Sequence, residues 1–312
     1  MIDATIERLR EVDRVVLLGA NGWFGRTMVD LLEAAFGDEM AERTDLYARG
    51  AHRLTSSAGR DLLASPLSEI GGLSGQPATL LVDCAYPTQE QVTLLGPDAY
   101  VEAVGDLREQ RRAAVERLRP EACVSLSSGA AKLFADGRPM AERTQVYGEM
   151  KRLDEWQMLK LCPELGVRLC IARVYAASGP HMTKASSYAL GDLIEQARAG
   201  GPIAIRAPHR VTRSYTLAAD ALGLAVLASL DADADRPELF ETGGEQVDLA
   251  ELARRVSLVV RGEEPELVLA APDGSAADVY LGDPERIRQL ADLYGLQLAE
   301  LDEQIRRTAE ND

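Results

Sequence analysis

The run YGEMK places a tyrosine and a lysine four residues apart, at Tyr147 and Lys151. On a helix the two side chains would share one face, because residues i and i+4 are neighbours there. A free tyrosine has a pKa of about 10, too high for efficient proton transfer at neutral pH, and a cation alongside lowers it. The pair is therefore predicted to exchange a proton with a substrate oxygen. The alternative is an ordinary helix face with an exposed lysine.

A hydroxyl donor is expected on the strand that precedes this helix. Ser125, Ser127 and Ser128 stand at the end of an apolar run at residues 122–127, and Ser128 begins the loop that follows. There its hydroxyl can hydrogen-bond a substrate oxygen, although strand-end serines are often only turn formers. Joined to the tyrosine and the lysine, Ser128 completes a candidate catalytic set.

A glycine-rich turn near the N-terminus fits a phosphate. The segment GANGWFG follows the first apolar run, and its candidate cofactor contacts are Gly19, Asn21, Gly22, Trp23, Phe24 and Gly25. The first glycine permits a tight turn, the second lets backbone amides approach a pyrophosphate, and the third lets the helix pack closely on the sheet. The anion then lies at a helix N-terminus, where unpaired amides favour it. Dinucleotide binding is predicted; the alternative is a strand–turn–helix connection with incidental glycines.

The end of the second predicted strand helps to choose the cofactor. NAD binding favours an acidic residue there, which holds the ribose 2′-hydroxyl. This sequence offers Arg49 instead, followed by His52 and Arg53, and a guanidinium suits the 2′-phosphate of NADP. We expect NADP, with NAD possible, unless Arg49 is simply a solvated strand-end residue. Further along, Asp61 and Leu62 could place a carboxylate near the adenine amino group.

Short apolar runs alternate with helical patterns along the first half of the chain. Strands are predicted at residues 14–19, 45–49, 80–85, 122–127, 167–173 and 203–206, and helices at 22–36, 98–118, 146–161, 186–199, 218–230, 249–260 and from Pro284 onward. Apolar strands separated by helices indicate a parallel sheet covered on both faces. We expect an α/β, doubly wound (Rossmann) domain at residues 1–173. Residues 174–312 are expected to form a smaller, mainly substrate-binding α/β domain, with some segments returning to the Rossmann core.

The composition excludes several classes of partner. Of the 312 residues, 34 are Lys or Arg and 50 are Asp or Glu, which gives a formal net charge of −16. The hydrophobic share of 46% is enough for a folded core. The acidity argues against nucleic acid and against an anionic membrane, because both bind surplus positive charge. We therefore expect a small-molecule substrate, no nucleic acid and no membrane.

The cysteines and the N-terminal segment bear on where the protein works. The four cysteines are Cys84, Cys123, Cys162 and Cys170, with no CxxC pairing and no histidine at metal-ligand spacing. Free buried thiols are predicted, and no metal site. The N-terminal segment is charged and lacks the apolar core of a secretory signal. A cytoplasmic location is expected.

Four segments in chain order resemble one family. GANGWFG at residues 19–25, SSGA at 127–130, YGEMK at 147–151 and ARVYAASGP at 172–180 resemble the extended short-chain dehydrogenases/reductases, and more narrowly the NAD(P)-dependent epimerase/dehydratase group acting on nucleotide sugars. RSYTLAAD at residues 213–220 is similar to the family's Arg-aromatic-strand-Asp segment. The resemblance implies that Ser128 orients the substrate oxygen, that Tyr147 is the acid/base, and that Lys151 supports it.

The resemblance also implies binding roles. Cys84, Ala85 and Tyr86 would line the cofactor at the end of their strand. Arg213 matches an arginine that contacts the diphosphate of the sugar nucleotide. Arg206, Arg210 and Arg213 together favour an anionic ligand near the proposed cleft, unless they form a solvated basic loop.

Three positions depart from the family's pattern. Ala176 stands where the family usually has Asn, so one expected substrate contact is missing or replaced. The loop at Ser128 lacks the Asp and Glu that drive elimination in the 4,6-dehydratases, which counts against a dehydratase of that type. The usual Pro-x-Ser before the tyrosine is also absent.

The leading hypothesis is a NAD(P)-dependent nucleotide-sugar epimerase or keto-sugar reductase. A hydride would pass between the nicotinamide C4 and a sugar carbon while Tyr147 moves the proton. The alternatives are an NADPH-dependent reductase of a non-nucleotide carbonyl substrate and a catalytically silent cofactor-binding protein on the same fold. The resemblance further implies a homodimer, in which the helices at residues 98–118 and 146–161 pair between subunits as a four-helix bundle.

Overall fold

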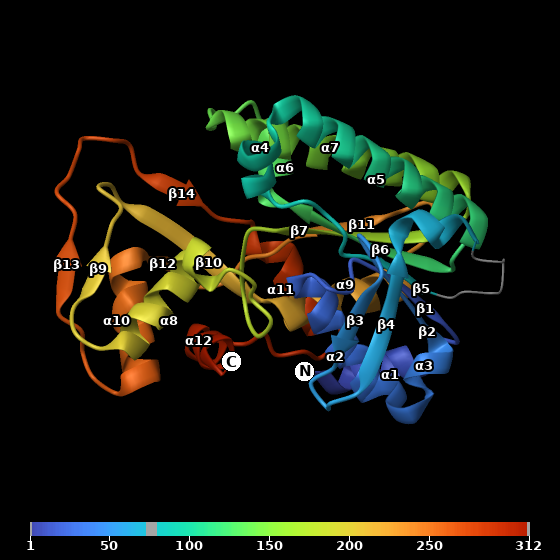
Figure 1. The fold of residues 1–312 in the computed structure, drawn as a ribbon, viewed down its shortest axis with the longest axis horizontal. Coiled ribbons are helices and arrows are strands. Elements are labelled where there is room, and N and C mark those ends of the chain that lie inside the picture. Colours follow the sequence, from blue (N-terminus) through green and yellow to red (C-terminus); the bar gives the residue numbers. More distant parts are fainter. Residues whose placement is uncertain (1, 73–79, 311–312) are drawn as a thin grey trace.

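The computed structural model describes residues 2–72 and 80–310, and its main element there is an eight-stranded sheet in the order β11-β7-β6-β5-β1-β2-β4-β3 (Figure 1). Its strands are β1 Val15–Leu18, β2 Thr44–Ala48, β3 His52–Thr55, β4 Asp61–Pro66, β5 Leu80–Asp83, β6 Ala122–Ser128, β7 Arg168–Val174 and β11 Glu238–Glu241. Neighbouring strands are parallel except β3 and β4. Because β1 lies between β2 and β5, the order reverses there, as in a doubly wound sheet. The predicted fold class is confirmed.

Helices cover both faces of this sheet, with α4 to α7 above it and α1 to α3 below it in Figure 1. The helices of this part are α1 Ile2–Arg10, α2 Trp23–Phe36, α3 Met40–Arg43, α4 Gln89–Leu95, α5 Pro97–Leu118, α6 Gly129–Ala135 and α7 Glu142–Glu164, with 3-10 turns η1 Gly37–Glu39 and η2 Leu67–Gly72. Val15 and Leu17 of β1 join the core under α2, whereas Val16 and Leu18 join the core under α5 and α7. All four side chains are fully buried, which is why the strand is apolar throughout instead of alternating.

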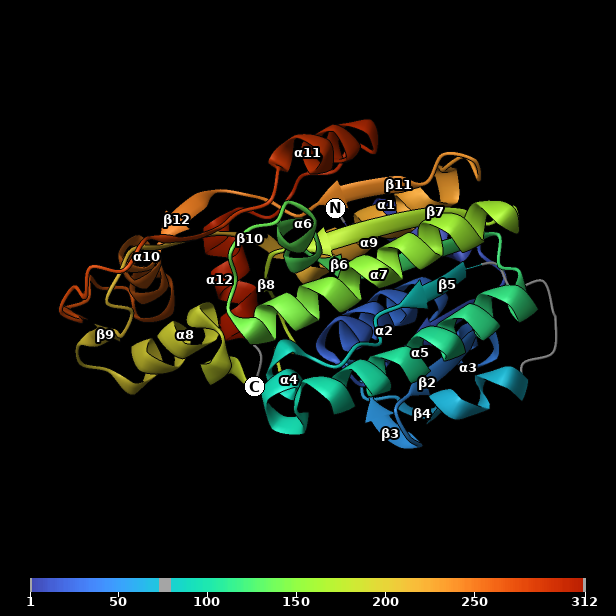
Figure 2. The same cartoon turned by 90° about the horizontal axis from the view of Figure 1, so that it is seen from above.

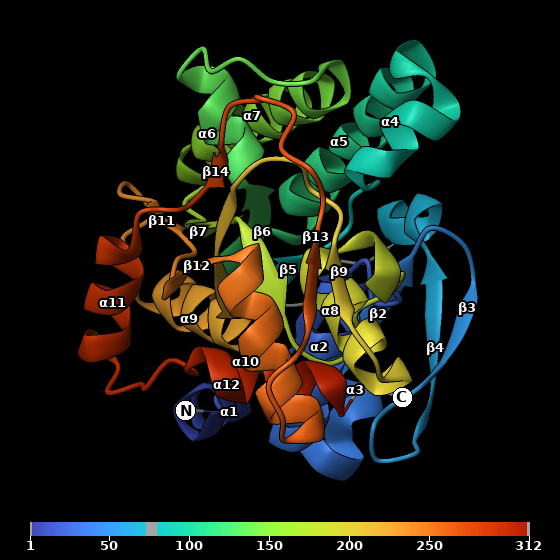
Figure 3. The same ribbon diagram turned by 90° about the vertical axis from the view of Figure 1, so that its left-hand side faces the viewer.

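The rest of the chain builds a second, smaller lobe, at the left of Figure 1 and facing the viewer in Figure 3. Its sheet has the order β12-β10-β14, with β8 paired to β10 and a separate β13-β9 pair. The elements are β8 Ala176–Ser178, η3 Ala185–Ser187, α8 Ala189–Ala199, β9 Ile203–Ile205, β10 Val211–Leu217, β12 Gln246–Asp248, α10 Leu249–Arg261, β13 Leu267–Leu269, β14 Asp278–Tyr280 and α12 Leu301–Ala309. Helices α8, α10 and α12 share one apolar core with these strands.

Three elements from the second half of the sequence return to the large sheet. They are α9 Ala218–Asp231, β11 and α11 Pro284–Leu293. β11 pairs in parallel with β7, and α9 packs on β7 and on α2. Figure 2 shows β11 beside β7 at the edge of the sheet. The division of the chain near residue 173 remains a prediction.

Several elements were not predicted from the sequence, among them α1 and the β3–β4 hairpin. The helix α1 packs against α2 and α9 and buries Leu9. The β3–β4 hairpin adds an antiparallel edge to the sheet, and its turn contains Gly59 at a φ of 83°, a conformation that favours glycine. Both elements are short, so their apolar periodicity is weak.

The four cysteines are free thiols, as expected, and three of them are buried. Within residues 2–72 and 80–310, no helix is both long and apolar enough to cross a membrane. The same residues contain no cluster of three His, Cys, Asp or Glu side chains arranged to hold a metal ion.

Candidate active site

The tyrosine and the lysine lie on α7, which packs closely on the short helix α6. Gly148 makes this approach possible, because a Cβ there would come within 2.6 Å of the Ala130 carbonyl oxygen. α6 begins directly after β6, so it holds the end of that strand against the face of α7 that carries Tyr147 and Lys151. The residue between the reactive pair thus positions the strand end that carries the candidate serine.

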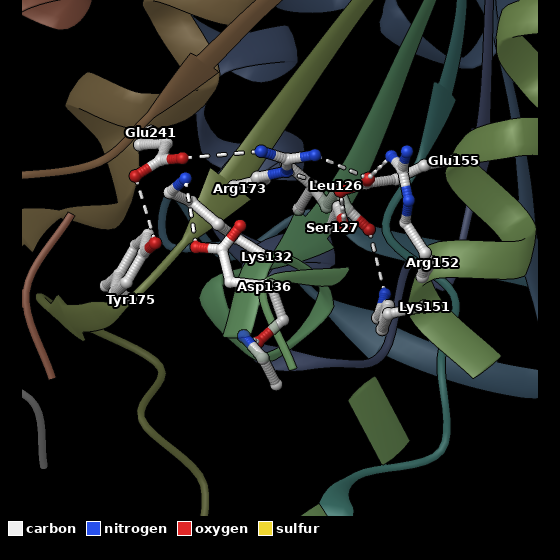
Figure 4. Close-up of polar contacts among 12 residues, drawn as sticks. Leu126, Ser127, Lys132, Asp136, Lys151, Arg152, Glu155, Arg173, Tyr175 and Glu241 are labelled. Atoms are coloured by element: carbon white, nitrogen blue, oxygen red, sulfur yellow. Dashed lines mark hydrogen bonds and ion pairs between the residues drawn. The ribbon is translucent and has the colours of Figure 1, made fainter. Parts of the chain in front are cut away.

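Lys151 is 5% exposed and points back toward β6 (Figure 4). Its Nζ donates to the Leu126 carbonyl oxygen at 2.8 Å and lies 3.4 Å from the centre of the Tyr86 ring. Burial lowers the pKa of Lys151 to about 8, and the Arg111 guanidinium shifts it in the same direction. The ammonium is therefore held by one carbonyl and one aromatic face, close to the pH at which it loses its proton.

Tyr147 is partly buried, and its ring meets the Tyr86 ring edge to face at 5.8 Å. Burial, followed by Tyr280, raises the pKa of Tyr147 above its usual value, while the Ser128 hydroxyl lowers it. The expectation that Lys151 brings this pKa down is wrong for this structure. Desolvation of the phenol outweighs the cation, whose ammonium is engaged with Leu126 and Tyr86.

Ser128 ends β6 and is the N-cap of α6. Its Oγ accepts from the Ala130 amide at 3.2 Å and lies 3.2 Å from the Tyr280 hydroxyl of β14. The Ser128 hydroxyl therefore caps the helix and also faces the candidate site. The structure brings Ser128, Tyr147 and Lys151 together at the carboxyl end of β6.

The glycine turn forms a cradle at the carboxyl end of β1, two strands along the sheet from β6. Gly19 has a φ of 84°, and a Cβ there would lie 2.6 Å from the Ala85 amide nitrogen. A Cβ on Gly25 would overlap the Gly19 carbonyl. No side chain caps the start of α2 at Gly22. A backbone cradle without side chains, at an uncapped helix N-terminus, fits a pyrophosphate.

Trp23 of this turn contacts the second lobe, whereas Phe24 packs against the core of the large sheet. Asn21 is exposed, Trp23 and Phe24 have their ring centres 5.6 Å apart, and Trp23 also meets Tyr188 at 5.6 Å. Tyr188 directly precedes α8. The turn therefore lies where the two lobes meet, which is a common place for a ligand cleft.

Cys84, Ala85 and Tyr86 follow β5 and pass beside the glycine turn. The Cys84 amide donates to the Leu18 carbonyl at 2.9 Å, and the Ala85 amide donates to Asp83 Oδ1 at 3.2 Å. These bonds fix the loop, and with it the Tyr86 ring that contacts Lys151.

A buried ion network lies beneath this loop. Arg111, 2% exposed, pairs with Asp83 and lies 3.5 Å from Asp154 Oδ1, to which Arg108 donates at 2.5 Å. Two arginines and two aspartates thus balance one another, as buried charges require. The network joins β5, α5 and α7, the three elements that hold Tyr86 and Lys151.

Arg49 is exposed and directly follows β2. The carbonyl oxygen of Tyr47, near the end of that strand, accepts from the amides of Gly19 and Ala20 at 2.8 and 2.9 Å. The end of β2 is thus tied to the glycine turn, and residues 48–53 contain no carboxylate.

Asp61 and Leu62 lie elsewhere. They begin β4, where Asp61 pairs with Thr55 in the hairpin and Leu62 is buried in the core. The other end of β4, at Ser65, is the one beside Tyr47, about 13 Å further along the strand. The structure therefore does not bring Asp61 and Leu62 to the glycine turn.

The three arginines predicted to lie near the cleft, Arg206, Arg210 and Arg213, are each paired with a carboxylate, so they do not form a free basic cluster. Arg206 lies 3.0 Å from Asp192 and its side chain is 71% exposed. Arg210 Nη2 lies 3.5 Å from Asp248 Oδ2. Arg213 differs in lying near the candidate serine, since its partner strand β14 also carries the Tyr280 hydroxyl.

Arg213 lies on β10, and its side chain contacts two residues of β14. Its Nη2 donates to Asp278 Oδ2 at 2.6 Å, and its guanidinium carbon lies 5.8 Å from the centre of the Tyr280 ring. Tyr280 is a site residue that the sequence predictions missed. No local signal marks it, because it lies 152 residues from Ser128 in the chain.

A second group of residues missed from sequence lies behind the site (Figure 4). Glu155, 1% exposed at the side chain, accepts from Ser127 Oγ at 2.7 Å and receives two hydrogen bonds of 2.8 Å from Arg173. Arg173 also contacts Glu241, which accepts from the Tyr175 hydroxyl at 2.9 Å. Burial alone would raise the pKa of Glu155, but Arg173 and Ser127 bring it below its usual value. Glu155 is one turn after Lys151, a spacing that marks it as part of the same face.

A family model described as the NAD dependent epimerase/dehydratase family matches residues 15–243. No curated protein matches the chain in sequence.

Solved structures of several 4-epimerases have a similar fold. The UDP-glucose 4-epimerase from Brucella ovis in complex with NAD has a TM-score of 0.72 and 15% identity, over 96% of this chain and 98% of that one. The UDP-N-acetylglucosamine 4-epimerase from Methanobrevibacter ruminantium M1 in complex with UDP-N-acetylmuramic acid has a TM-score of 0.71 and 15% identity, over 96% and 97%. The UDP-glucose 4-epimerase from Thermus thermophilus in complex with NAD has a TM-score of 0.67 and 17% identity, over 95% and 98%.

Proposed function

Because the chain belongs to the NAD-dependent epimerase/dehydratase family, we propose that it is a nucleotide-sugar epimerase in which Tyr147 carries the proton of a sugar hydroxyl. The observation that supports this most directly is the meeting of Ser128, Tyr147 and Lys151 beside the glycine turn. A hydroxyl, a phenol and an ammonium at the mouth of a dinucleotide cradle suit the transfer of a hydride and a proton at one carbinol carbon.

The cofactor would be held by the amides at the start of α2 and by Lys151 on the nicotinamide side. When bound, the nicotinamide supplies the group that accepts and returns the hydride. The other face of the site is built by Tyr86, whose ring stacks against the Lys151 ammonium.

Tyr147 and Ser128 would handle the sugar oxygen. For this the phenol must first lose its own proton. As a phenolate, the Tyr147 oxygen would take the hydroxyl proton as the carbon gives up its hydride to the bound nicotinamide, and would return that proton when the hydride comes back to the opposite face. Ser128, beside it at the end of β6, donates a hydrogen bond to the same oxygen and fixes its position.

The substrate class rests on Arg213 and on the structural relatives described above, which are named as UDP-sugar 4-epimerases. Arg213 has a planar fork that suits a diphosphate, and it lies on the strand next to the one that contacts Ser128. Chromatographic analysis of UDP-glucose and UDP-N-acetylglucosamine incubated with purified protein tests the proposal. Appearance of the 4-epimers without net consumption of cofactor supports it, and the absence of both turnover and cofactor binding contradicts it.

A keto-sugar reductase is the second candidate, favoured by two observations. The raised pKa of Tyr147 keeps its proton on the phenol, ready to be donated to a carbonyl oxygen. Arg49, in place of a carboxylate, suits NADPH, the usual reductant. Loss of NADPH absorbance with a 4-keto nucleotide sugar would identify this activity.

For the cofactor we propose NADP, although the related structures hold NAD. Exchanging Arg49 for glutamate should weaken NADPH binding at least about tenfold and leave NADH binding equal or tighter, because the 2′-phosphate loses its cation. Titration of both cofactors by tryptophan fluorescence measures this. Arg254→Glu, at an exposed position on α10 in the second lobe, is the matched charge control. Equal affinity of the wild type and Arg49→Glu for NADPH would show that Arg49 is a solvated residue that does not bind the 2′-phosphate.

For assembly we propose a homodimer through α5 and α7, which lie side by side on the outside of the large sheet (Figure 2). Exposed apolar side chains gather on this layer: Leu94, Leu95, Val101, Leu153 and Trp156. Trp156→Glu should convert a dimer into a monomer in sedimentation velocity, because the charge would be buried at the interface. Leu269→Glu is the control, since Leu269 is 62% exposed against 61% for Trp156. A wild-type monomer at working concentration would overturn the proposal.

A further inference from the structure

The three-residue strand β14 engages two side chains to which the proposed function assigns the substrate. Its first residue, Asp278, binds the Arg213 guanidinium twice, through Oδ2 at 2.6 Å and through its carbonyl oxygen at 3.2 Å. Its last residue, Tyr280, places its hydroxyl 3.2 Å from Ser128 Oγ. One short segment therefore occupies both the candidate diphosphate contact and the candidate sugar contact.

The charge balance at Arg213 follows from this pairing. The other acceptor of its guanidinium is the Thr212 carbonyl oxygen at 2.9 Å, so Asp278 supplies the countercharge in the part of the chain that the structure describes. The side chains of Arg213 and Asp278 are 21% and 48% exposed. A pair so exposed to water is weak, and a ligand of higher charge can replace it.

The Asp278 end of β14 is open to water, whereas its Tyr280 end is anchored. β14 pairs with β10 over three residues, with Arg213 beside Tyr280, and the residues from 271 to 279 before and along it are exposed. The Tyr280 ring packs on the Tyr175 ring at 4.7 Å. An exposed segment with few buried apolar contacts moves at low cost, so the Asp278 carboxylate can leave Arg213 while Tyr280 stays in place.

We propose that Asp278 is an internal competitor of the substrate for Arg213, so that a ligand must bring a diphosphate to displace it. This inference rests on the proposed function, in which Arg213 binds the diphosphate of a nucleotide sugar. The Tyr280 ring is held against Tyr175 at 4.7 Å, so the competition concerns the Arg213 guanidinium alone. A neutral carbonyl compound leaves the Arg213–Asp278 pair in place.

Calorimetry with UDP and with uridine separates this role from others. Asp278→Asn keeps the shape and removes the charge, and it should tighten UDP binding by about twofold to fivefold, the range expected for one exposed ion pair. Uridine, which carries no phosphate, should bind both proteins equally. Asp273→Asn is the control for general charge, because Asp273 lies on the same exposed segment and its carboxylate accepts from the Ser275 amide.

The outcomes separate the two proposals. Suppose that UDP binds the wild type and that Arg213→Met weakens this binding. If Asp278→Asn then leaves the affinity for UDP unchanged or lower, Asp278 holds Arg213 in place, and the proposal that it competes with the substrate is wrong. Equal tightening by Asp278→Asn and Asp273→Asn also overturns it, because any removed charge would then suffice. If UDP binds neither wild type nor Asp278→Asn, the proposed substrate class fails and the competition fails with it.

Discussion

Replacing Tyr147 with phenylalanine should lower kcat by about a hundredfold to ten-thousandfold, the usual worth of a positioned acid–base group. The affinity for cofactor should stay unchanged, because the glycine turn and Lys151 remain. The variant keeps the ring and its edge-to-face contact with Tyr86, so only the hydroxyl is lost. Steady-state turnover of the best nucleotide sugar, together with fluorescence titration of the cofactor, measures both quantities.

Two further tyrosines make this test specific. Tyr294→Phe is the control for loss of a tyrosine hydroxyl and should keep wild-type turnover, because Tyr294 packs against the core under α2. Tyr280→Phe removes the other hydroxyl near Ser128. If Tyr147→Phe keeps more than about a tenth of the activity while Tyr280→Phe loses it, the acid–base role belongs to Tyr280.

Exchanging Lys151 for methionine should lower kcat/KM on the order of a hundredfold, because the ammonium held between Leu126 and Tyr86 and its proposed contact with the cofactor are both lost. Methionine fills a similar buried volume, and the Leu126 carbonyl loses its donor. Lys160→Met removes the same charge from an exposed position on the same helix and should leave kcat/KM near the wild-type value. Equal losses in the two variants would mean that general charge, not the site, carries the effect.

The pH profile gives Lys151 a signature that a merely structural lysine lacks. With a pKa of about 8, the side chain is about nine-tenths charged at pH 7 and about one-tenth charged at pH 9. The cationic form is thus lost as the pH rises through 8, and kcat/KM, which reports the free enzyme, should fall on that side. Lys151→Met should show no such alkaline fall, because it has no proton to lose there. An unchanged alkaline limb in the variant would assign the titration to another group.

The local patterns of the sequence were enough to predict the fold class and to single out the residues of the candidate site. Apolar runs fix buried parallel strands, and the β1 run is buried on both faces as its composition predicts. The glycines of the first turn stand where a Cβ would strike backbone, a constraint that any strand–turn–helix of this kind imposes. The four-residue spacing of Tyr147 and Lys151 is a property of the helix itself. Each of these features depends on neighbours within a few residues in the chain.

The tertiary structure decided what the site residues contact and how they titrate. Lys151 turns toward the Leu126 carbonyl and the Tyr86 ring, and the pKa of Tyr147 rises where the sequence led us to expect a fall. Of the three arginines predicted near the cleft, Arg213 lies beside Tyr280 on the paired strands β10 and β14, and the Tyr280 hydroxyl contacts Ser128. The physical reason is that desolvation and ion pairing are set by groups from separate elements. Lys151 of α7 meets Leu126 of β6 and Tyr86 after β5, and β10 and β14 reach this place only when the two lobes pack together.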